Sequence, residues 1–575
     1  MLTYRITPQP QNHRFQIELT ITPADSHLTL SMANWTSGSY LIRDYAGRIR
    51  SPQASAGLLF QRDKSHWELT ALTPNHPLTI RWEVFAYSQG IHDAWLDADR
   101  GFFNPAALFL IPSQYSREPV RLIFADTTFT PYTSLSQTDT FQYDAPDLHT
   151  MLDAPVTLLR SGAPHTLIQV KSHGIPHRLL ITGRNATRLN TDKLRRDLSA
   201  ILDTTLSFWG RAPFSDYLFH LHLGTELYGG LEHDASCVLQ MDPSSLPGQH
   251  ESVPPKNYAD FLTLVAHEYF HAWLVKFLRP AHFLPYDLSS ECHSHDLWVF
   301  EGITSYYESL LPLRAGVISQ TEFFSQINQR FNRVRRREGF TRQSLEDASF
   351  NAWTHLYKQT ADSPYCQTSY YGKGAILAFM LDAALRHQAP DASLDILLKQ
   401  WFDEALSDPT KRGLPDRHFF NRLPSHAMAA HFEHLARSTD MEQWQNTWDQ
   451  TLLILGLDET PVCDVDVSET LLGLVLSNKD GRILVRHTAA NGSAFDSGLF
   501  AEDEIVALDH YRVTQHSFNR QIEQSQGQTL SLHFFRQGRL FETTLHIPSE
   551  RTSVHKKLEP GNLTPTGRAW LGMVV

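Results

Sequence analysis

Two histidines four residues apart, with a glutamate directly after the first, are the residues best suited to metal chemistry in this chain. They lie in the segment VAHEYFHAW, which runs from Val265 to Trp273. Residues four apart share one face of a helix, so His267 and His271 can offer two imidazoles to one tetrahedral zinc ion. Glu268 then stands beside the ion, where it can act as the general base on zinc-bound water.

A third protein ligand is expected downstream, because a catalytic zinc site holds three side chains and keeps one position open. Two glutamates compete for this role. Glu301 opens an apparent amphipathic helix, whereas Glu291 lies in a stretch rich in serine and histidine that is typical of a loop. Ligands on rigid elements are better preorganised, so the sequence favours Glu301 over Glu291. The expected cofactor is Zn²⁺, one ion per chain.

The elements that must position these residues change in kind along the chain. The first 170 residues contain short alternating segments such as 14–21, which indicate an antiparallel β domain. Helical periodicity dominates the middle of the chain, and it predicts a helix from Asp260 through the histidine pair to Phe277. Residues 466–548 again read as strands. The pattern is that of a multidomain α+β protein.

Composition excludes several classes of protein. The 575 residues are 41% hydrophobic and carry a formal net charge of −12, which argues against a nucleic-acid binder. No apolar run reaches the ~18 residues of a membrane span, so no membrane association is expected. The N-terminus shows no signal-peptide pattern, and four widely spaced cysteines form no disulfide framework. A cytoplasmic location is therefore expected.

Beyond these patterns, the chain resembles a known family. The segments HEYFHAW, LWVFEGITSYY (297–307) and Arg314-Ala315-Gly316 resemble the glycyl aminopeptidase family, thermolysin-like gluzincin metallopeptidases with a C-terminal PDZ domain. The segment WTSGSYLIRDYAGRI (35–49) is similar to the N-terminal β domain of that family. The resemblance implies a β-sandwich-like domain over 1–170, a thermolysin-like, mostly helical zinc peptidase domain over 171–460, a PDZ domain over 461–550 and a C-terminal tail over 551–575.

The resemblance also implies roles for further residues. Gly229-Gly230-Leu231-Glu232-His233 resembles the aminopeptidase motif whose glutamate holds the free α-amine of the substrate, and this places Glu232 in that role. The other reading of Glu232 is a surface turn after two glycines. Tyr370-Tyr371-Gly372-Lys373-Gly374 resembles the motif whose tyrosine stabilises the oxyanion, and alignment on Lys373-Gly374 selects Tyr371 over Tyr370. Ser305 stands where such enzymes often place an aspartate that orients a zinc histidine, so the orienting residue is open.

The expected function is removal of N-terminal residues from peptides, and the resemblance implies a preference for glycine or alanine. Gly229 and Gly230 are expected to bring the backbone close to the bound residue. The alternatives are an endopeptidase directed by the PDZ domain and a catalytically silent peptide-binding scaffold. A PDZ domain could bind a peptide ligand or the chain's own tail, Met573-Val574-Val575, with Leu472-Gly473-Leu474 as the carboxylate nest.

Overall fold

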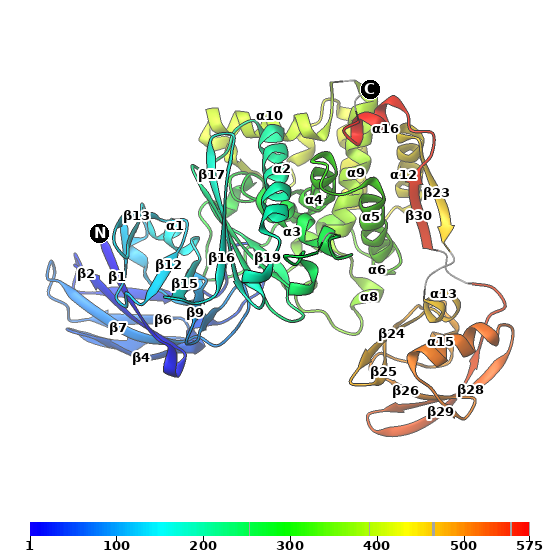
Figure 1. Ribbon diagram of the computed structural model, residues 1–575, viewed down its shortest axis with the longest axis horizontal. Helices are drawn as coiled ribbons and strands as arrows, with labels where there is room; N and C mark the ends of the chain where they lie inside the picture. The colour runs from blue at the N-terminus through cyan, green and yellow to red at the C-terminus, as the bar shows by residue number, and fades with distance from the viewer. Residues whose placement is uncertain (252, 390, 463–465, 552–554, 574–575) are drawn as a thin grey trace. The chain divides into compact units, whose positions relative to one another are not determined.

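The computed structural model describes residues 1–251, 253–389, 391–462, 466–551 and 555–573 (Figure 1). The chain forms two compact units, each made from two stretches of sequence. The first comprises Met1–Glu322 and Asp395–Arg422, and the second comprises Phe323–Leu394 and Leu423–Val575. Among the described helices, none combines the length and the apolar character that a bilayer crossing requires.

The first 160 residues form three β-sheets around one apolar core. On β2, Phe15, Ile17, Leu19 and Ile21 all point inward and are at most 3% exposed, which confirms the alternating pattern. The strands pair antiparallel except for β1 with β11, which run parallel, as the long stretch of chain between them permits. The largest sheet contains, in order, β13 (Ser136–Asp139), β14 (Gln142–Ala145), β11 (Val120–Phe124), β1 (Leu2–Gln9), β2 (Arg14–Ile21), β7 (Leu78–Phe85) and β4 (Ile49–Ala54).

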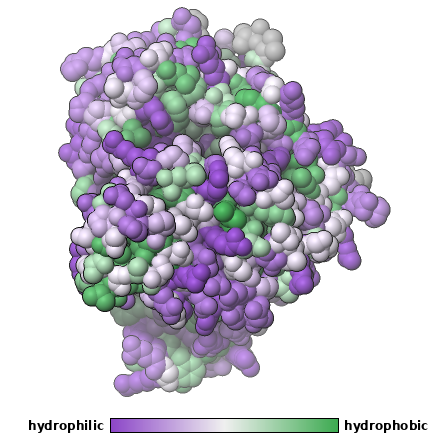
Figure 2. Space-filling view, turned by 90° about the vertical axis from the view of Figure 1, so that its left-hand side faces the viewer, coloured by the Kyte–Doolittle hydropathy of each residue, from purple (hydrophilic) through white to green (hydrophobic). Residues whose placement is uncertain are grey.

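Two smaller sheets complete this β-rich part, together with the short helix α1 (Leu148–Leu152). One contains β10 (Leu110–Pro112), β3 (Leu28–Met32), β6 (His66–Thr70) and β5 (Leu58–Gln61). The other contains β12 (Phe129–Tyr132), β15 (Val156–Arg160), β9 (Arg100–Phe103) and β8 (Ala94–Leu96). Figure 2 shows one face of the molecule, where hydrophilic residues dominate and hydrophobic ones form small separate groups.

A five-stranded sheet and the helices packed near it carry the residues of interest. In order, the strands are β16 (His165–Ser172), β17 (Ile175–Gly183), β18 (Tyr217–Leu223), β20 (Ser236–Met241) and β19 (Tyr228–Glu232). The expected domain boundary near residue 170 therefore falls inside β16. The helices are α2 (Thr191–Trp209), α3 (Tyr258–Phe270), α4 (Ile303–Arg314) and α10 (Leu394–Ser407), and β21 (Arg279–Pro280) pairs with β22 (Gly413–Leu414).

The second unit begins with a helical body. Its helices are α5 (Gln320–Arg335), α6 (Gly339–Arg342), α7 (Leu345–Phe350), α8 (Ser363–Cys366), α9 (Tyr370–Gln388), α11 (His426–Arg437) and α12 (Met441–Leu455). The segment expected as a C-terminal tail is built into this body. It forms β30 (His555–Pro560), which pairs with β23 (Leu457–Val462), and α16 (Pro565–Trp570), whose Trp570 packs against Phe323 and Phe379.

Between β23 and β30 the chain forms a separate sheet with its own apolar core. The segment expected to be strands is confirmed as β24 (Leu474–Lys479), β25 (Arg482–Thr488), β26 (Glu504–Leu508), β27 (Tyr511–Arg512), β28 (Thr529–Arg536) and β29 (Arg539–His546). Three helices accompany them, α13 (Val467–Leu472), α14 (Ser493–Asp496) and α15 (Gln515–Gln524). Both ends of the inserted segment therefore return to the helical body.

Candidate active site

The two histidines predicted as ligands lie at the end of α3, which packs against β19 and β20. Their ring centroids are 4.6 Å apart. The helix ends at Phe270, so the prediction of a helix to Phe277 is wrong, and the reason is a tight turn in which Val275 has a φ of 101°. His271 keeps right-handed backbone angles and therefore stays on the face of α3 that carries His267.

The structure brings Glu301, and not Glu291, to the histidine pair. Oε2 of Glu301 lies 3.2 Å from Nε2 of His271 and 3.8 Å from Nε2 of His267. Glu301 belongs to a π-helical turn, Trp298–Gly302, that leads into α4, and it is 1% exposed. Glu291 is exposed in a loop. The preference for a ligand on a rigid element therefore selected the glutamate that the structure places at the site.

The Nδ1 atom of each histidine has an oxygen acceptor at hydrogen-bond distance. Oε2 of Glu308 lies 2.6 Å from Nδ1 of His267, and the carbonyl oxygen of Leu274 lies 2.9 Å from Nδ1 of His271. These acceptors hold a proton on each Nδ1, so the Nε2 atom of each ring is the one available to a metal ion.

The two Nε2 atoms and Glu301 form a cluster that fits a metal ion. The two Nε2 atoms are 3.0 Å apart, and one ligand atom from each of the three residues lies within 4.8 Å of the others. Three converging acceptors are mutually repulsive until a cation lies between them. Two imidazoles and a carboxylate are the donor set of a catalytic zinc site.

Glu308 is the functional residue that the sequence reasoning missed. It stands seven residues after Glu301, and Ser305, four residues after Glu301, was the position considered for the orienting carboxylate. Seven residues make almost two full helical turns, so Glu301 and Glu308 project from the same side of the helix. The heptad spacing was visible in the sequence and could have identified Glu308.

Replacing Glu308 by alanine is expected to weaken metal binding by about 10- to 100-fold, the usual effect of removing a partner that orients a ligand. The reason is that His267 would lose the acceptor on Nδ1 and with it its fixed tautomer. Competition with a chromogenic chelator measures the affinity. Ser305→Ala is the matched control on the same helix and should bind as the wild type does. A Glu308→Ala protein of unchanged affinity would contradict this role.

Burial and acidic neighbours shape the electrostatics of the site. Burial raises the pKa of Glu268 well above its usual range; His271 opposes this shift, and the carboxylates of Glu232 and Glu301 reinforce it. Burial alone would lower the pKa of His271, but Glu301 and Glu232 outweigh it and raise that pKa to about 10. The carboxylates therefore favour the binding of a positively charged group, such as a metal ion, at this site.

Glu232, predicted to bind the substrate amine, lies beside the metal cluster. It ends β19, the edge strand of the sheet, and is 4% exposed. One carboxylate oxygen each from Glu232 and Glu268 and a ring nitrogen of His271 all lie within 4.8 Å of one another. Within the described part of the chain, Oε1 of Glu232 is buried and has no hydrogen-bond partner. The reading of Glu232 as a surface turn residue is therefore wrong, because the side chain is buried.

The two glycines of β19 differ in their surroundings. A Cβ on Gly230 would lie 2.1 Å from Oε1 of Glu268, so the missing side chain makes room for the glutamate predicted as the base. Gly229 has a φ of +157°, and its nearest neighbour would be Cδ1 of Ile91 at 3.5 Å. The strand β20 lies inside the sheet, and the strand at the edge is β19.

Tyr371 lies in the second unit, near the start of α9. Its hydroxyl is 3.2 Å from the hydroxyl of Tyr357, and its ring stacks on Tyr370 with centroids 4.7 Å apart. Tyr371 is half-buried, whereas Tyr370 is fully buried. The greater exposure of Tyr371 agrees with its choice over Tyr370, and its role stays a prediction.

Lys373, two residues further along α9, is buried, and the hydrogen bonds of its amino group to described residues go to backbone carbonyls rather than to a carboxylate. Its Nζ donates to the carbonyl oxygens of Phe340 and Gln343, each at 2.8 Å, and burial lowers its pKa to about 7. Between pH 7 and 10.5 the unfolded chain, with an ordinary lysine pKa of 10.5, holds more protons than the folded one. Stability therefore rises with pH across that window.

Lys373→Met is expected to remove this pH dependence. The free energy of unfolding of the wild type, relative to the variant, should increase by about 4 kcal/mol between pH 7 and pH 10, since each unit of pKa shift is worth about 1.4 kcal/mol. Denaturant titrations at several pH values, followed by tryptophan fluorescence, measure this difference. Parallel stability curves for the two proteins would show that Lys373 keeps an ordinary pKa.

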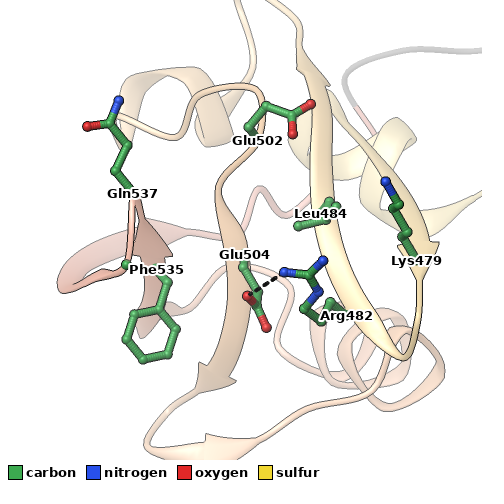
Figure 3. Close-up of a pocket in the computed structure, with 8 residues that line it drawn as sticks. Lys479, Arg482, Leu484, Glu502, Glu504, Phe535 and Gln537 are labelled. Carbon is green, nitrogen blue, oxygen red and sulfur yellow. Dashed lines mark ion pairs between the residues drawn. The ribbon is translucent and has the colours of Figure 1, made fainter.

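A groove of about 500 Å³ lies elsewhere, on the C-terminal sheet (Figure 3). Lys479 and Arg482 face Glu502 and Glu504 across it, and Arg482 pairs with Glu504 at 3.9 Å. None of the residues that line it belongs to the metal cluster. The donor geometry at α3, rather than the size of a cavity, therefore identifies the chemical site.

One backbone N–H of the expected carboxylate nest at Leu472-Gly473-Leu474 already donates a hydrogen bond within the chain. The Gly473 N–H donates to the carbonyl oxygen of Glu469 at 3.0 Å, as part of the end of α13. The adjacent strand β24 forms an edge of its sheet. Val574 and Val575, which would carry the carboxylate, lie outside the described residues, so docking of the tail stays a prediction.

Comparison with known proteins gives two family matches, one to the N-terminal β part and one that begins in the first unit and continues into the second. The family model described as M61 glycyl aminopeptidase matches residues 260–377, and the model described as the peptidase M61 N-terminal domain matches residues 3–158. A search of curated proteins found no match.

Two solved structures illustrate the range of structural similarity. The aminopeptidase N family protein from Idiomarina loihiensis is similar with a TM-score of 0.90 and 29% identity, over 99% of this chain and 100% of that chain. The M1 zinc metallopeptidase from Deinococcus radiodurans is similar with a TM-score of 0.45 and 12% identity, over 76% of this chain and 93% of that chain.

The two family matches agree with each other and with the site. The 260–377 match contains Glu268 as well as His267, His271 and Glu301, and one ligand atom from each of the last three lies within 4.8 Å of the others. The 3–158 match covers the three-sheet β part, and the Idiomarina structure extends the similarity over nearly the whole chain. The chain therefore matches the models of the M61 glycyl aminopeptidases and of their N-terminal domain, and these matches support a metallo-aminopeptidase.

Proposed function

We propose that this protein is a zinc aminopeptidase that removes single N-terminal residues from peptides and favours small ones. The observation that supports this most directly is the buried carboxylate of Glu232, which lies within 4.8 Å of Glu268 and His271 and has one oxygen without a partner among the described residues. A buried, incompletely paired carboxylate is costly unless a cation binds it. The α-ammonium group is the feature that distinguishes the start of a peptide from its interior.

His267, His271 and Glu301 would hold the zinc, one ion per chain at this site. Bound there, zinc supplies Lewis acidity and lowers the pKa of water toward ~7. Glu268 receives the proton from the attacking water and passes it to the leaving amine. The raised pKa of Glu268 suits a group that must hold this proton, and Gly230 leaves room for its carboxylate. Tyr371 donates a hydrogen bond to the developing oxyanion.

A count of charges supports the same assignment. Four carboxylates lie at this site. They are Glu268 and the three glutamates whose charges raise its pKa, Glu232, Glu301 and Glu308. The two positive charges of zinc and the single charge of a substrate ammonium would offset three of these four negative charges. The site is thus closer to neutral when metal and a free amino terminus are both bound than when either is absent.

The preference for glycine or alanine follows from the crowding around the two carboxylates. Gly38 and Gly230 are so close to Glu232 and Glu268 that a Cβ on either glycine would overlap a carboxylate oxygen. The backbone of Gly38 and Gly230 thus lies close to the position where the first residue of the substrate would bind. A small side chain at that residue avoids steric overlap.

Glu232→Ala is expected to lower kcat/KM on free-amine peptides by about 10- to 150-fold, because a charge-assisted hydrogen bond is worth about 1.5–3 kcal/mol. Metal content should not change, since Glu232 is not a ligand. Steady-state kinetics on glycyl and alanyl anilides, with metal analysis of the same samples, measure both quantities.

The matched substrate control is the same peptide with an acetylated N-terminus, which the wild type should cleave poorly. Efficient cleavage of acetylated peptides at internal bonds would establish the alternative, an endopeptidase. Absence of any hydrolysis in the zinc-loaded protein would establish the other alternative, a peptide-binding scaffold.

We also propose that the inserted sheet between β23 and β30 is a PDZ domain that binds a peptide. Its edge strand β24 offers unpaired backbone groups for strand addition, and its core is separate from that of the helical body. The ligand would be an extended peptide or the tail that ends at Val575.

A further inference from the structure

A loop of the N-terminal β part, Trp35–Tyr40, reaches the carboxylate of Glu232. Gly38 in this loop has a φ of +84°, and a Cβ built on it would lie 2.5 Å from both Oε1 and Oε2 of Glu232. A real Cβ does not approach oxygen so closely, so the carboxylate occupies the space that a side chain at residue 38 would fill. Glycine is also the residue that adopts this backbone conformation without strain.

Buried hydrogen bonds hold the loop in place beside Gly38. The Ser37 hydroxyl donates to Oδ1 of Asp153 at 3.0 Å, and Lys276 donates to the same Ser37 oxygen at 3.1 Å and to Asp153 at 2.7 Å. The indole N–H of Trp35 donates to the carbonyl oxygen of Asp287 at 2.9 Å. The loop cannot withdraw from Glu232 without breaking these contacts.

The same aspartate also holds the chain immediately after Glu232. Oδ1 of Asp153 lies 3.2 Å from Nδ1 of His233, and Oδ2 accepts the Asp234 N–H at 2.7 Å. Asp153 thus connects the loop on one side of the Glu232 carboxylate with the backbone that carries that carboxylate. The distance between Gly38 and Glu232 is fixed by one buried charged group.

We propose that Gly38 is a positioning residue for Glu232, and that through it the N-terminal β part takes part in selecting free amino termini. This inference rests on the proposed role of Glu232 as the amine site. Because Gly38 has no side chain, the Glu232 carboxylate can lie against its Cα. In that position its oxygen without a partner would bind the substrate ammonium. A methyl group at residue 38 would push the carboxylate away from that position while leaving the metal ligands untouched.

Gly38→Ala is expected to raise KM for free-amine substrates by about 10- to 100-fold with little change in kcat, because binding of the ammonium is lost equally from ground and transition states. Gly174→Ala is the matched control. Gly174 also has a φ of +84°, but a Cβ there would meet nothing within 4 Å. Both variants therefore place alanine at the same positive φ, and their metal contents should agree, whereas only Gly38→Ala brings a methyl group against Glu232.

A double-mutant cycle with Glu232→Ala separates the possible outcomes. Gly38→Ala should have no further effect on KM in the Glu232→Ala background. The inference is overturned if Gly38→Ala behaves like Gly174→Ala, or if it raises KM equally with and without Glu232. If Glu232→Ala itself leaves KM and kcat unchanged on free-amine substrates, the proposed function fails first, and the two failures are distinguishable.

A second, independent observation lies on the C-terminal sheet. His510, His533 and Glu542 each place one ligand atom within 4.8 Å of the other two. His533 and Glu542 face each other on β28 and β29, and His533 is opposite Ala507 of β26. His510 comes from the tight turn after β26, where Asp509 and His510 have φ values of 50° and 63°. Its ring centroid is 5.0 Å from that of His533.

We infer that these three residues form a second transition-metal site, separate in sequence from the catalytic cluster. Two imidazoles and one carboxylate suit Zn²⁺, Ni²⁺ or Cu²⁺ and leave coordination positions open to solvent. The side chains of His533 and Glu542 are 17% and 59% exposed, so an ion can enter from water. Ser531 donates to Oε1 of Glu542 at 2.7 Å, which orients the carboxylate.

Equilibrium dialysis of the full-length protein against Zn²⁺ tests this site. The wild type should bind two zinc ions at saturation, and His510→Ala should bind one and keep its peptidase activity. His546→Ala, which removes an exposed histidine four residues from Glu542 on the same strand, should bind two. The double variant His267→Ala/His271→Ala should keep one ion, at the second site. One zinc in the saturated wild type, or two in His510→Ala, would overturn the inference.

Discussion

Glu268→Gln is expected to lower kcat by about 10²- to 10⁴-fold while the protein keeps its metal, because general acid–base catalysis contributes a factor of that size. Glutamine has nearly the same shape and fills the space next to Gly230, but it cannot take up the proton. In the proposed site His267, His271 and Glu301 hold the zinc and Glu268 does not, so the affinity for zinc should change little. Loss of turnover with retention of metal is thus the signature of a base.

The measurement combines metal analysis by mass spectrometry with steady-state kinetics on an alanyl anilide. Glu301→Ala is the control for a lost ligand and should bind little metal, and Glu291→Ala, in the exposed loop, should resemble the wild type. Stoichiometric loss of zinc from Glu268→Gln would mean that this glutamate is a ligand. Undiminished turnover would mean that another group accepts the proton.

Tyr371→Phe is expected to lower kcat by about 10²- to 10³-fold with little change in KM, because a donor to the oxyanion acts on the transition state and not on the bound substrate. The substitution removes only the hydroxyl, so the stacking on Tyr370 is preserved. A transition-state analogue should lose affinity by a similar factor, and inhibition constants for such an analogue measure this independently of turnover.

Tyr370→Phe is the matched control, since it removes a hydroxyl from the neighbouring, fully buried ring. Its kcat should stay near that of the wild type. An equal loss in Tyr370→Phe, with Tyr371→Phe unaffected, would transfer the role to Tyr370. Equal kcat values in all three proteins would show that neither tyrosine binds the oxyanion.

Local periodicity explains which parts of the site the sequence revealed. His267 and His271 depend only on helical spacing, and that spacing is present in the residues themselves. The preference for Glu301 needed one additional principle, that ligands lie on rigid elements; the structure places Glu301 beside the two histidines, and its role as a ligand stays a prediction. Glu308 obeys the same helical spacing but lies seven residues after Glu301, whereas the sequence prediction considered only Ser305, four residues after it.

Local periodicity does not predict contacts between segments that are distant in the sequence. Gly38 and Glu232 lie almost two hundred residues apart, and no spacing rule connects a loop of the β part to the end of β19. The pairing of β23 with β30, which turns an expected tail into part of the helical body, is equally non-local. The early end of α3 depends on the positive φ of Val275, a backbone state that β-branched residues rarely adopt.

The π-helical turn at Trp298–Gly302 has a consequence for how the chain tolerates changes of length. A helix advances by about 100° per residue, so the loss of one residue from this turn would rotate one flank against the other by about that angle. Upstream, Asp296 accepts the Arg417 N–H at 2.6 Å; downstream, Glu301 and Glu308 meet the two histidines. Single-residue deletions or insertions here should therefore destroy the site although every ligand is still encoded, whereas conservative replacements within the turn should be far less damaging.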